Sequence, residues 1–250
     1  MIPALLIGRA GSSGFKNKNV SMILGRPLMS YPILAAQHSK LVDKVFLSTD
    51  SDNMKQIGLK LGAQLIDRPD FLATQEALAE DAFAHGYRAI RDQNAGEIEF
   101  IVLLFCNGAT ITPGIIDRGI EALRTERSFD SAATVSRYNM WSPLRAKKIV
   151  GGELLPFVGK ECFDAATCDR DSQGDTFFAD CSAFVVRPKC LEDLNYGDPP
   201  FRWMGRKVYP LDQWGGLDID YEWQVGQVEY WLRQYGFTEH STPYDESVKR

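Results

Sequence analysis

A glycine-rich turn flanked by cations stands near the beginning of the chain. The segment LLIGRAGSSGFKNKN, residues 5–19, runs from an apolar stretch into a loop, and Arg9 and Lys18 lie on either side of that loop. Backbone N–H groups of such a turn can face an anion, and the two side chains can neutralise it. A triphosphate suits this set of cations and amides better than a single phosphate does. The alternative is a surface turn that carries solvated lysines.

The spacing of the loop glycines excludes the two best-known phosphate motifs. Gly8, Gly11 and Gly14 lie three residues apart, whereas the dinucleotide fingerprint needs its first two glycines two apart. No Gly-Lys-Ser/Thr follows the last glycine, which excludes a Walker A loop. The phosphate hypothesis therefore depends on the composition of the loop and on its place after a probable strand.

The cysteines and histidines do not predict a metal site. The chain has five cysteines, an odd number without a Cys-x-x-Cys pair, and three histidines that lie far apart in sequence. Zinc sites need closely spaced ligands of these types. We therefore expect buried or unreactive thiols and no zinc.

Apolar runs alternate with helical patterns through the first half of the chain. Four short apolar runs are typical of strands buried on both faces, and they span residues 3–8, 44–50, 63–69 and 99–106. Between them, Ser51 can cap a helix that Gly62 ends, and Pro113 can begin another. This alternation predicts an α/β fold with a mostly parallel, doubly wound sheet. Ligands of such sheets bind beyond the carboxyl ends of the strands, where the loop would lie.

The second half of the chain is less regular. Residues 131–159 indicate strands around a Gly-Gly turn, and residues 177–188 and 205–211 indicate two more strands. Residues 218–236 predict a helix that Gly236 ends. Its apolar stripe would comprise Tyr221, Val225, Val228, Leu232 and Tyr235. We expect a single domain over residues 1–250 with a β-rich insertion at about 131–190.

The composition and net charge limit the classes of partner that we expect. The chain has 250 residues, 44% hydrophobic and 24% charged, with a net charge of −5. An acidic protein does not attract nucleic acid or an anionic membrane, so neither is expected as a partner. No apolar stretch reaches the roughly 20 residues of a membrane span, and the first residues lack a basic region typical of a secretion signal. We therefore expect a cytoplasmic protein.

Three segments in the same order resemble the acylneuraminate (CMP-sialic acid or nonulosonic acid) cytidylyltransferases. IGRAGSSGFKNKNVSMILGRPLMSYPI is similar to the family's A-R-G-G-S-K-G-x-x-x-K-N with its later G-x-P-L. VFLSTDSDNMKQIGLKLGAQLIDRPDFLAT is similar to S-T-D-S followed by R-P-x-x-L-A, and GLDIDYEWQ to D-I-D-T-E-x-D. The resemblance implies a nucleotidyltransferase fold of the nucleotide-diphospho-sugar transferase type. It also implies Mg²⁺-dependent transfer of CMP from CTP to the anomeric oxygen of an acidic sugar, with release of pyrophosphate.

The resemblance also implies a nucleotide site. Its residues would be Arg9, Gly11, Ser12, Lys18, Asn19 and Arg68. We add Ser13 from the same loop and Asn107, a polar residue close to Phe105 in the sequence, to the expected nucleotide-binding residues. Arg9 and Lys18 would act in catalysis by stabilising the departing pyrophosphate. Ser13 stands where the family has a lysine, and Phe105 where it has a glutamine that helps to read cytosine.

Asp218 and Asp220 match the family's paired aspartates, which bind Mg²⁺ beside the sugar. Residues i and i+2 of an extended segment point to one face, so the two carboxylates can share a hard cation. Asp218 would also contact the sugar and take part in catalysis. The alternative is that Asp220 only caps the C-terminal helix.

Sugar recognition is expected from a charged segment before a strand. Arg170, Gln173 and Asp175 lie there, and the family keeps an Arg-Gln pair in this region. A solvated loop is the alternative. Cys181 replaces a sugar-facing asparagine of the family. Residues 139–148 are similar in position to its dimerisation and lid segment, so the resemblance implies a homodimer.

Three hypotheses stay open after the sequence. The first is a Mg²⁺-dependent cytidylyltransferase that takes CTP and a nonulosonic or related carboxylated sugar. The second is a nucleotidyltransferase of the same fold that uses another base or a sugar 1-phosphate, which the replaced glutamine and lysine motivate. The third is a non-catalytic subunit that binds a nucleotide sugar. Competition among nucleoside triphosphates and assays of turnover would separate them.

Overall fold

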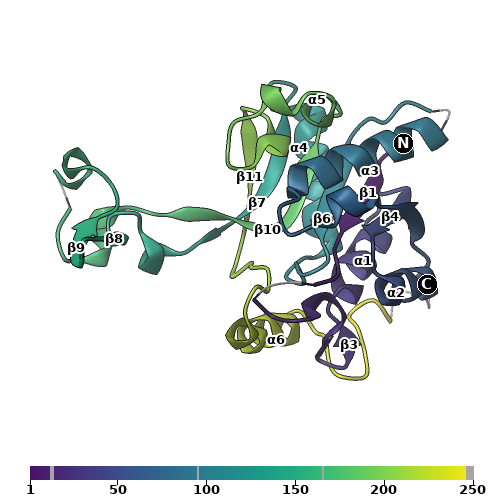
Figure 1. The fold of residues 1–250 in the computed structure, drawn as a ribbon, viewed down its shortest axis with the longest axis horizontal. Helices are drawn as coiled ribbons and strands as arrows, with labels where there is room; N and C mark the ends of the chain where they lie inside the picture. Colours follow the sequence, from purple (N-terminus) through teal and green to yellow (C-terminus); the bar gives the residue numbers. More distant parts are fainter. Residues whose placement is uncertain (12–13, 95, 165, 246–250) are drawn as a thin grey trace.

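A seven-stranded sheet forms the centre of the chain (Figure 1). The computed structural model describes residues 1–11, 14–94, 96–164 and 166–245. The strands lie in the order β11-β7-β10-β6-β1-β4-β5, and neighbours are parallel except where β10 pairs with β6 and β7. Their bounds are Pro3–Ile7 (β1), Lys44–Thr49 (β4), Gln64–Asp67 (β5), Ile101–Phe105 (β6), Ser131–Arg137 (β7), Phe177–Val186 (β10) and Val208–Gln213 (β11). The predicted α/β class with a mostly parallel sheet is confirmed.

Helices cover both faces of this sheet. Their bounds are Ser30–Gln37 (α1), Asp52–Lys60 (α2), Ala79–Gln93 (α3), Pro113–Thr125 (α4), Lys189–Glu192 (α5) and Val225–Gln234 (α6). On one face, α1, α2 and α4 contribute Ile33, Met54 and Ile116 to a single apolar cluster. On the other face, α3 and α5 contribute Phe83 and Leu191. The sheet is therefore doubly wound. No helix in the described part of the chain is long and apolar enough to span a bilayer.

The alternation of strand residues explains why β1 lies at the centre. Leu5 is buried in the cluster beneath α3, whereas its neighbour Leu6 is buried in the cluster beneath α1, α2 and α4. Successive side chains of a strand point to opposite faces. Full burial of a leucine contributes roughly 2 kcal/mol, so both faces of β1 favour an apolar residue at every position.

The predicted helix boundaries agree with the structure. The Ser51 hydroxyl accepts a hydrogen bond from the Met54 N–H, and Gly62 takes a positive φ of 80° just after α2. Pro113 is the first residue of α4. Gly236 takes a positive φ of 85° just beyond α6. Each boundary uses the residue type that the local backbone requires.

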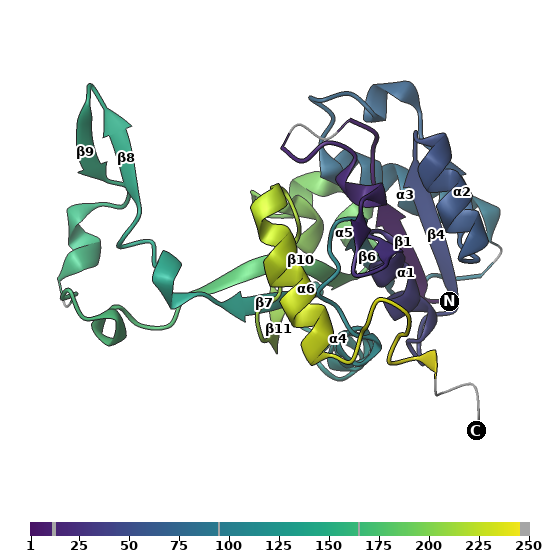
Figure 2. The ribbon, with the colours of Figure 1, turned by 90° about the horizontal axis from the view of Figure 1, so that it is seen from below.

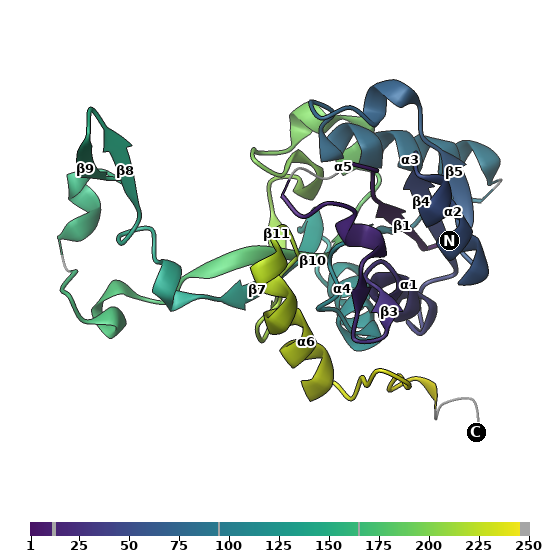
Figure 3. The same cartoon turned by 60° about the horizontal axis from the view of Figure 1, so that its bottom comes forward.

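The C-terminal helix differs from its prediction at the first turn. Val228 and Leu232 are buried as expected, but Tyr221 is 55% exposed and lies outside α6. The Gln224 side chain accepts hydrogen bonds from the N–H groups of Asp220 and Tyr221 at 2.7 and 2.8 Å. These bonds keep the chain extended before the helix, so Tyr221 does not belong to the apolar stripe. Figure 3 shows α6 leading into the C-terminal segment, and its Val228 and Leu232 belong to an apolar cluster with Leu28 and Tyr31.

A long arm, residues 138–176, leaves the sheet between β7 and β10 (Figures 1 and 2). It carries the hairpin Lys147–Val150 (β8) and Glu153–Pro156 (β9), whose turn is Gly151–Gly152 as predicted. The insertion expected at about 131–190 is shorter in the structure, because β7 and the inner half of β10 are strands of the main sheet. A smaller hairpin, Met22–Ile23 (β2) and Arg26–Pro27 (β3), follows the glycine-rich loop.

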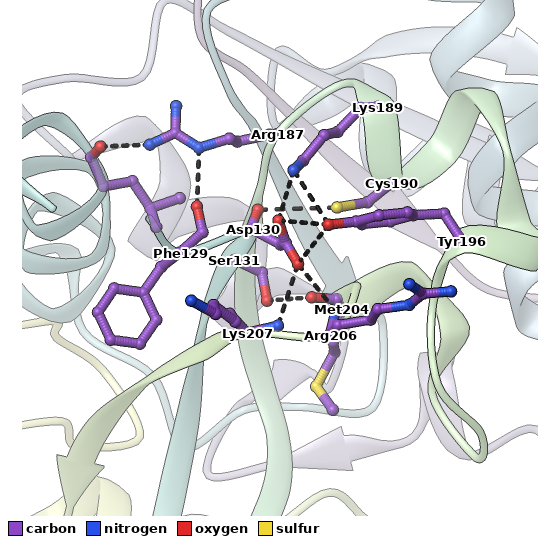
Figure 4. A network of polar contacts seen from close by, with 11 residues as sticks. Phe129, Asp130, Ser131, Arg187, Lys189, Cys190, Tyr196, Met204, Arg206 and Lys207 are labelled. Atoms are coloured by element: carbon purple, nitrogen blue, oxygen red, sulfur yellow. Dashed lines mark hydrogen bonds and ion pairs between the residues drawn. The ribbon is translucent and has the colours of Figure 1, made fainter. Parts of the chain in front are cut away.

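A buried carboxylate fixes the chain immediately before β7 (Figure 4). Asp130 accepts hydrogen bonds from the Lys189 ammonium at 2.5 Å, the Tyr196 hydroxyl at 3.0 Å, and the backbone N–H groups of Arg206 and Lys207 at 2.9 and 3.0 Å. Burial alone would raise the pKa of Asp130. The lysine and the other donors outweigh this effect and lower the pKa to about 2.

Candidate functional site

A cleft of about 380 Å³ opens at the carboxyl ends of β1, β5 and β6. Ile7 ends β1, Arg68 follows β5 and Phe105 ends β6, and all three line the cleft. Asp220 and Tyr221, from the extended segment before α6, also line it. Open α/β sheets bind their ligands at this edge. The glycine-rich loop therefore starts at the ligand-binding side of the sheet.

The loop approaches the Asp218–Asp220 segment so closely that only glycine fits. A Cβ atom on Gly14 would lie 2.5 Å from the carbonyl oxygen of Asp220. At the other side of the loop, the Asp50 carboxylate accepts a hydrogen bond from the Ala10 N–H at 2.9 Å. The loop is thus held against two segments that lie far from it in the sequence.

Most of the predicted nucleotide residues gather at this cleft. Those that line it are Arg9, Lys18, Asn19, Arg68 and Asn107. Gly11, with a positive φ of 73°, borders a smaller neighbouring cavity. Ser12 and Ser13 lie outside the described residues.

Lys18 joins the loop to the predicted metal carboxylates. Its Nζ lies 2.5 Å from Oδ1 of Asp220, although 202 residues separate the two in the chain. The Lys18 side chain is 13% exposed and that of Asp220 is 56% exposed. The hydrogen bond that Asp220 accepts thus comes from the loop and not from a helix N–H, which disfavours a capping role.

Asn107 holds the same segment from the side of β6. Its Nδ2 donates to Asp218 Oδ2 at 2.9 Å and to the Ile219 carbonyl at 3.0 Å. Its own carbonyl accepts from the Ile219 N–H at 3.1 Å. Both amide hydrogens are therefore engaged by the carboxylate segment, so Asn107, which lines the cleft, orients Asp218, which does not.

The electrostatics of this edge are dominated by carboxylates. Burial and the charge of Asp220 raise the pKa of Asp218 to about 6, and Lys18 and Asn107 oppose that rise. Burial and nearby carboxylates, with Asp218 first among them, also raise the pKa of the Cys181 thiol. Cys181 takes a positive φ of 58° where the register of β10 shifts. Strained residues at bulges are frequent near functional sites, but Cys181 does not line the cleft.

Two buried polar residues form the floor of the cleft. Asn19 is 7% exposed; its Nδ2 donates to the Arg9 carbonyl at 3.4 Å, and its Oδ1 has no hydrogen-bond partner among the described residues. Arg68 donates from Nη2 to the Ser48 carbonyl at 2.9 Å and from Nε to the Ser48 hydroxyl at 3.3 Å. Burial lowers the pKa of Arg68. A buried acceptor without a partner is costly unless a ligand supplies a donor.

The remaining wall of the cleft is apolar. Phe105 packs edge-on against Phe83 and Trp203, with ring centroids 5.2 and 6.1 Å apart, and Leu72 and Ala82 line the same side. No amide of the kind expected from the family pattern stands at position 105. A flat, apolar face of a ligand such as a nucleobase suits this wall.

The carboxylate pair fits a hard divalent cation. Asp218 and Asp220 supply oxygen ligands, and their mutual repulsion, which contributes to the raised pKa of Asp218, is relieved when a cation lies between them. Within the described residues, no group of three or more His, Cys, Asp or Glu side chains could hold a metal. Magnesium is typically bound by one or two carboxylates together with substrate phosphates. The pair therefore suits a metal that arrives with a nucleotide.

Three of the four residues predicted for the sugar, Arg170, Gln173 and Asp175, lie on the arm, and Gln173 and Asp175 do not line the cleft of the same chain. Asp175 forms an ion pair with Arg137 at 3.2 Å and accepts from Asn139 at 2.8 Å. Gln173 donates to a backbone carbonyl of the arm itself. The Arg170 side chain lies outside the described residues. The sugar-binding role expected of these residues stays a prediction.

Asp180 was missed from the sequence. It is buried in β10, and its carboxylate belongs to a polar network that reaches the Asp218–Asp220 segment. A signal was available, because a carboxylate interrupts the apolar strand FFADCSAFVV. Charged side chains are rarely buried unless specific donors surround them.

Residues 3–141, more than half of the chain, match the family model described as cytidylyltransferase. The matched segment carries the glycine-rich loop, Arg68 and Asn107. The chain belongs to the cytidylyltransferase family. The family expected from the three sequence motifs is thereby confirmed.

Curated relatives of this chain include N-acylneuraminate cytidylyltransferases and a CMP-N,N'-diacetyllegionaminic acid synthase. An N-acylneuraminate cytidylyltransferase from Escherichia coli is 36% identical over 91 residues, which cover 36% of this chain and 22% of the relative. N-acylneuraminate cytidylyltransferase A from Danio rerio is 27% identical over 90% of this chain and 50% of the relative. A CMP-N,N'-diacetyllegionaminic acid synthase from Campylobacter jejuni is 37% identical over 32% of each chain. The chain thus spans about half or less of these relatives.

Solved structures with the same fold align over nearly the whole of this chain. A CMP:2-keto-3-deoxy-manno-octonic acid synthetase in complex with CTP has a TM-score of 0.69 at 14% identity, and the alignment covers 93% of this chain and 98% of that one. A 4-diphosphocytidyl-2C-methyl-D-erythritol synthase has a TM-score of 0.64 at 12% identity, with 92% and 97% covered. At these identities the likeness shows the fold.

Proposed function

We propose that this protein transfers CMP from CTP to the anomeric oxygen of a nonulosonic or related carboxylated sugar and releases pyrophosphate. The observation that carries the proposal is the contact of 2.5 Å between Lys18 and Asp220. At the cleft it joins a cation of the glycine-rich loop to Asp220, in the segment that carries both carboxylates, as a reaction at a nucleoside triphosphate requires. The nucleotide substrate also argues for a cytoplasmic enzyme, because nucleoside triphosphates are abundant there.

The chain's own residues would bind the triphosphate and stabilise its transition state. In the proposed reaction, the anomeric oxygen forms a bond to the α-phosphorus, the bond from that phosphorus to the oxygen bridging to the β-phosphate breaks, and the hydroxyl proton is released. Negative charge grows on the departing pyrophosphate. Arg9 and Lys18 are positioned at the cleft to stabilise that charge.

Asp218 and Asp220 would hold Mg²⁺ together with the phosphates of CTP. When bound, the metal would neutralise charge on the phosphoryl oxygens. Asp218 would also lie beside the attacking hydroxyl of the sugar, and Asn107 keeps it there through the hydrogen bond of 2.9 Å. The fit rests on the carboxylate donors and on the repulsion between them.

The floor and the apolar wall would hold the nucleoside. The Asn19 Oδ1 atom, buried without a partner among the described residues, can accept a hydrogen bond from a donor of the nucleotide. Arg68 offers a guanidinium at the same floor, and Phe105 offers an aromatic surface for the base.

The arm would make the enzyme a homodimer and complete the sugar site across the interface. Ile149 and Leu154 lie opposite each other in the hairpin and are 78% and 67% exposed, and Phe157 beside them is also exposed. An isolated two-stranded hairpin is marginally stable in water, so these side chains favour burial against a second copy. Arg170, Gln173 and Asp175 would then serve the sugar in the partner's cleft.

Thermal shifts with CTP, UTP, ATP and GTP, each with and without Mg²⁺, test the nucleotide part without knowledge of the sugar. A ligand at a hundred times its dissociation constant stabilises by about 2.7 kcal/mol, which raises the midpoint by roughly 5–10 °C. We expect CTP to raise the midpoint of thermal unfolding and Mg²⁺ to increase that rise. Lys18→Ala should abolish it, whereas Lys16→Ala, at an exposed loop position that does not line the cleft, should not. No shift with any nucleotide would refute the proposal.

Pyrophosphate release with a panel of acidic nine-carbon sugars then tests the transfer step. Activity should require CTP, Mg²⁺ and both carboxylates, so that Asp218→Ala and Asp220→Ala are each inactive. Full activity of Asp218→Ala would contradict the assigned role.

A second candidate is a nucleotidyltransferase of the same fold that uses another base. Phe105 in the apolar wall favours it, because no side-chain amide at this position can read cytosine. A larger shift with UTP or GTP than with CTP would put this candidate first.

A further inference from the structure

A second buried carboxylate lies behind the site. Asp180 is 5% exposed and accepts four hydrogen bonds, all from uncharged donors. The Thr134 hydroxyl at 2.6 Å and the Ser182 N–H at 3.1 Å reach Oδ1. The Ser136 hydroxyl at 2.7 Å and Gln213 Nε2 at 2.9 Å reach Oδ2. Because donors are directed at both oxygens, position 180 requires a side chain that only accepts hydrogen bonds, and an ionised carboxylate is such a group.

This carboxylate packs directly against the segment that leads to the metal ligands. The Ser136 hydroxyl, which donates to Asp180, accepts a hydrogen bond from the Gly216 N–H at 2.8 Å. A Cβ atom on Gly216 would overlap Oδ2 of Asp180. The backbone of Gly216, two residues before Asp218, therefore packs directly against the Asp180 carboxylate.

Gln213 extends the same network to the next residue of the segment. Its Nε2 donates to Asp180 and to the Thr110 carbonyl, the latter at 3.2 Å. The Thr110 hydroxyl in turn accepts from the Leu217 N–H at 2.8 Å. Leu217 immediately precedes Asp218, so the backbone on this side of the metal carboxylates is fixed by groups that Asp180 organises.

We propose that Asp180 is a positioning residue for the metal–nucleotide site, through which the Gly216–Leu217 backbone holds Asp218 and Asp220 toward the phosphates. The inference rests on the proposed function, since it concerns the same two carboxylates. Asp180 does not line the cleft. Its effect passes through the network and does not involve direct contact with CTP.

Asp130 provides a matched control. Asp130 is also a buried aspartate that accepts at least four hydrogen bonds. It lies just before the first residue of β7, whereas Ser136 lies near the last residue of β7 and Asp180 lies beside that end in β10. The donors to Asp130, drawn in Figure 4, are Lys189 of α5, Tyr196 beyond that helix, and the backbone of Arg206 and Lys207 before β11. Asp130→Asn should therefore destabilise the fold without altering the metal site.

The test measures how Mg²⁺ strengthens CTP binding, with the wild type, Asp180→Asn and Asp130→Asn compared by calorimetry. An asparagine at position 180 would place a side-chain N–H group opposite donors that now bond to the Asp180 carboxylate. We expect the Mg²⁺ concentration for the half-maximal effect to rise about tenfold, a change typical of residues behind metal ligands. CTP affinity without Mg²⁺ should stay within about twofold, because the loop is untouched. Asp130→Asn should lower only the melting temperature.

Gln213→Leu is the second variant, because it removes one donor and leaves the carboxylate in place. It should shift the Mg²⁺ dependence in the same direction by a smaller factor. Normal Mg²⁺ dependence of Asp180→Asn and Gln213→Leu would overturn the positioning role and leave the proposed function intact, and so would an equal shift in Asp130→Asn. A wild type whose CTP binding ignores Mg²⁺ would overturn the proposed function and, with it, the positioning role.

Discussion

Replacing Asp130 by asparagine should make stability respond less to acid. The pKa of Asp130 is about 2 in the folded chain, against 3.8 for an ordinary aspartate. A difference of this size corresponds to about 2 kcal/mol of stabilisation. Because the folded pKa is the lower one, this stabilisation is fully present well above pH 4. It is lost as the pH falls from about 4 through about 2, where the folded protein also takes up the proton.

Urea unfolding of the wild type and Asp130→Asn at pH 7, 5, 4, 3 and 2 measures this effect. Asparagine does not titrate, so the difference in unfolding free energy between the two proteins isolates the carboxylate from every other acid group. We expect this difference to shrink by about 2 kcal/mol between pH 7 and pH 2. A difference that stays constant across the series would refute the reasoning, because the hydrogen bonds of Figure 4 would then not favour the ionised form.

Three further outcomes follow from packing and exposure. Gly8→Ala should lower the unfolding free energy by about 1–3 kcal/mol in thermal denaturation, because its Cβ would overlap Met54 and lie 2.8 Å from Cys106 Sγ. Phe105→Gln should increase the preference for CTP over UTP in paired thermal shifts, at the cost of a lower melting temperature; an unchanged preference would remove the residue from base selection. The double variant Ile149→Asp and Leu154→Asp should be monomeric in light scattering while its CTP shift persists, and a dimer of unchanged affinity would exclude the arm as the contact.

The sequence predicted those parts of the fold that local chemistry determines. The run at residues 3–8 is apolar at every strand position because β1 is covered on both faces. Ser51, Pro113 and Gly236 mark helix ends because hydrogen-bond capping, a fixed φ and a positive φ are properties of single residues. Such features depend on neighbours in the chain and not on tertiary contacts.

Particular hydrogen bonds and contacts between distant segments decided what the sequence did not predict. Tyr221 fits a helical stripe by spacing, yet its N–H donates to the Gln224 side chain three residues later, which keeps it outside the helix. Lys18 and Asp220 were both selected as site residues, but their contact across 202 positions is a property of the folded sheet. Asp180 has no motif of its own, since its proposed role comes from four donors contributed by β7, β10 and β11.

The antiparallel direction of β10 explains why the root of the arm lies at the same edge of the sheet as the cleft. Since β10 runs opposite to β6 and β7, its first residues lie at the edge where those strands end, which is the edge of the cleft. An insertion between β7 and β10 must therefore emerge beside the site. The Tyr138 hydroxyl, at the root of the arm, donates to the Gly216 carbonyl at 2.9 Å, and Gly216 also packs on Asp180. Any contact that orders the arm root thus bears on the backbone that carries Asp218 and Asp220.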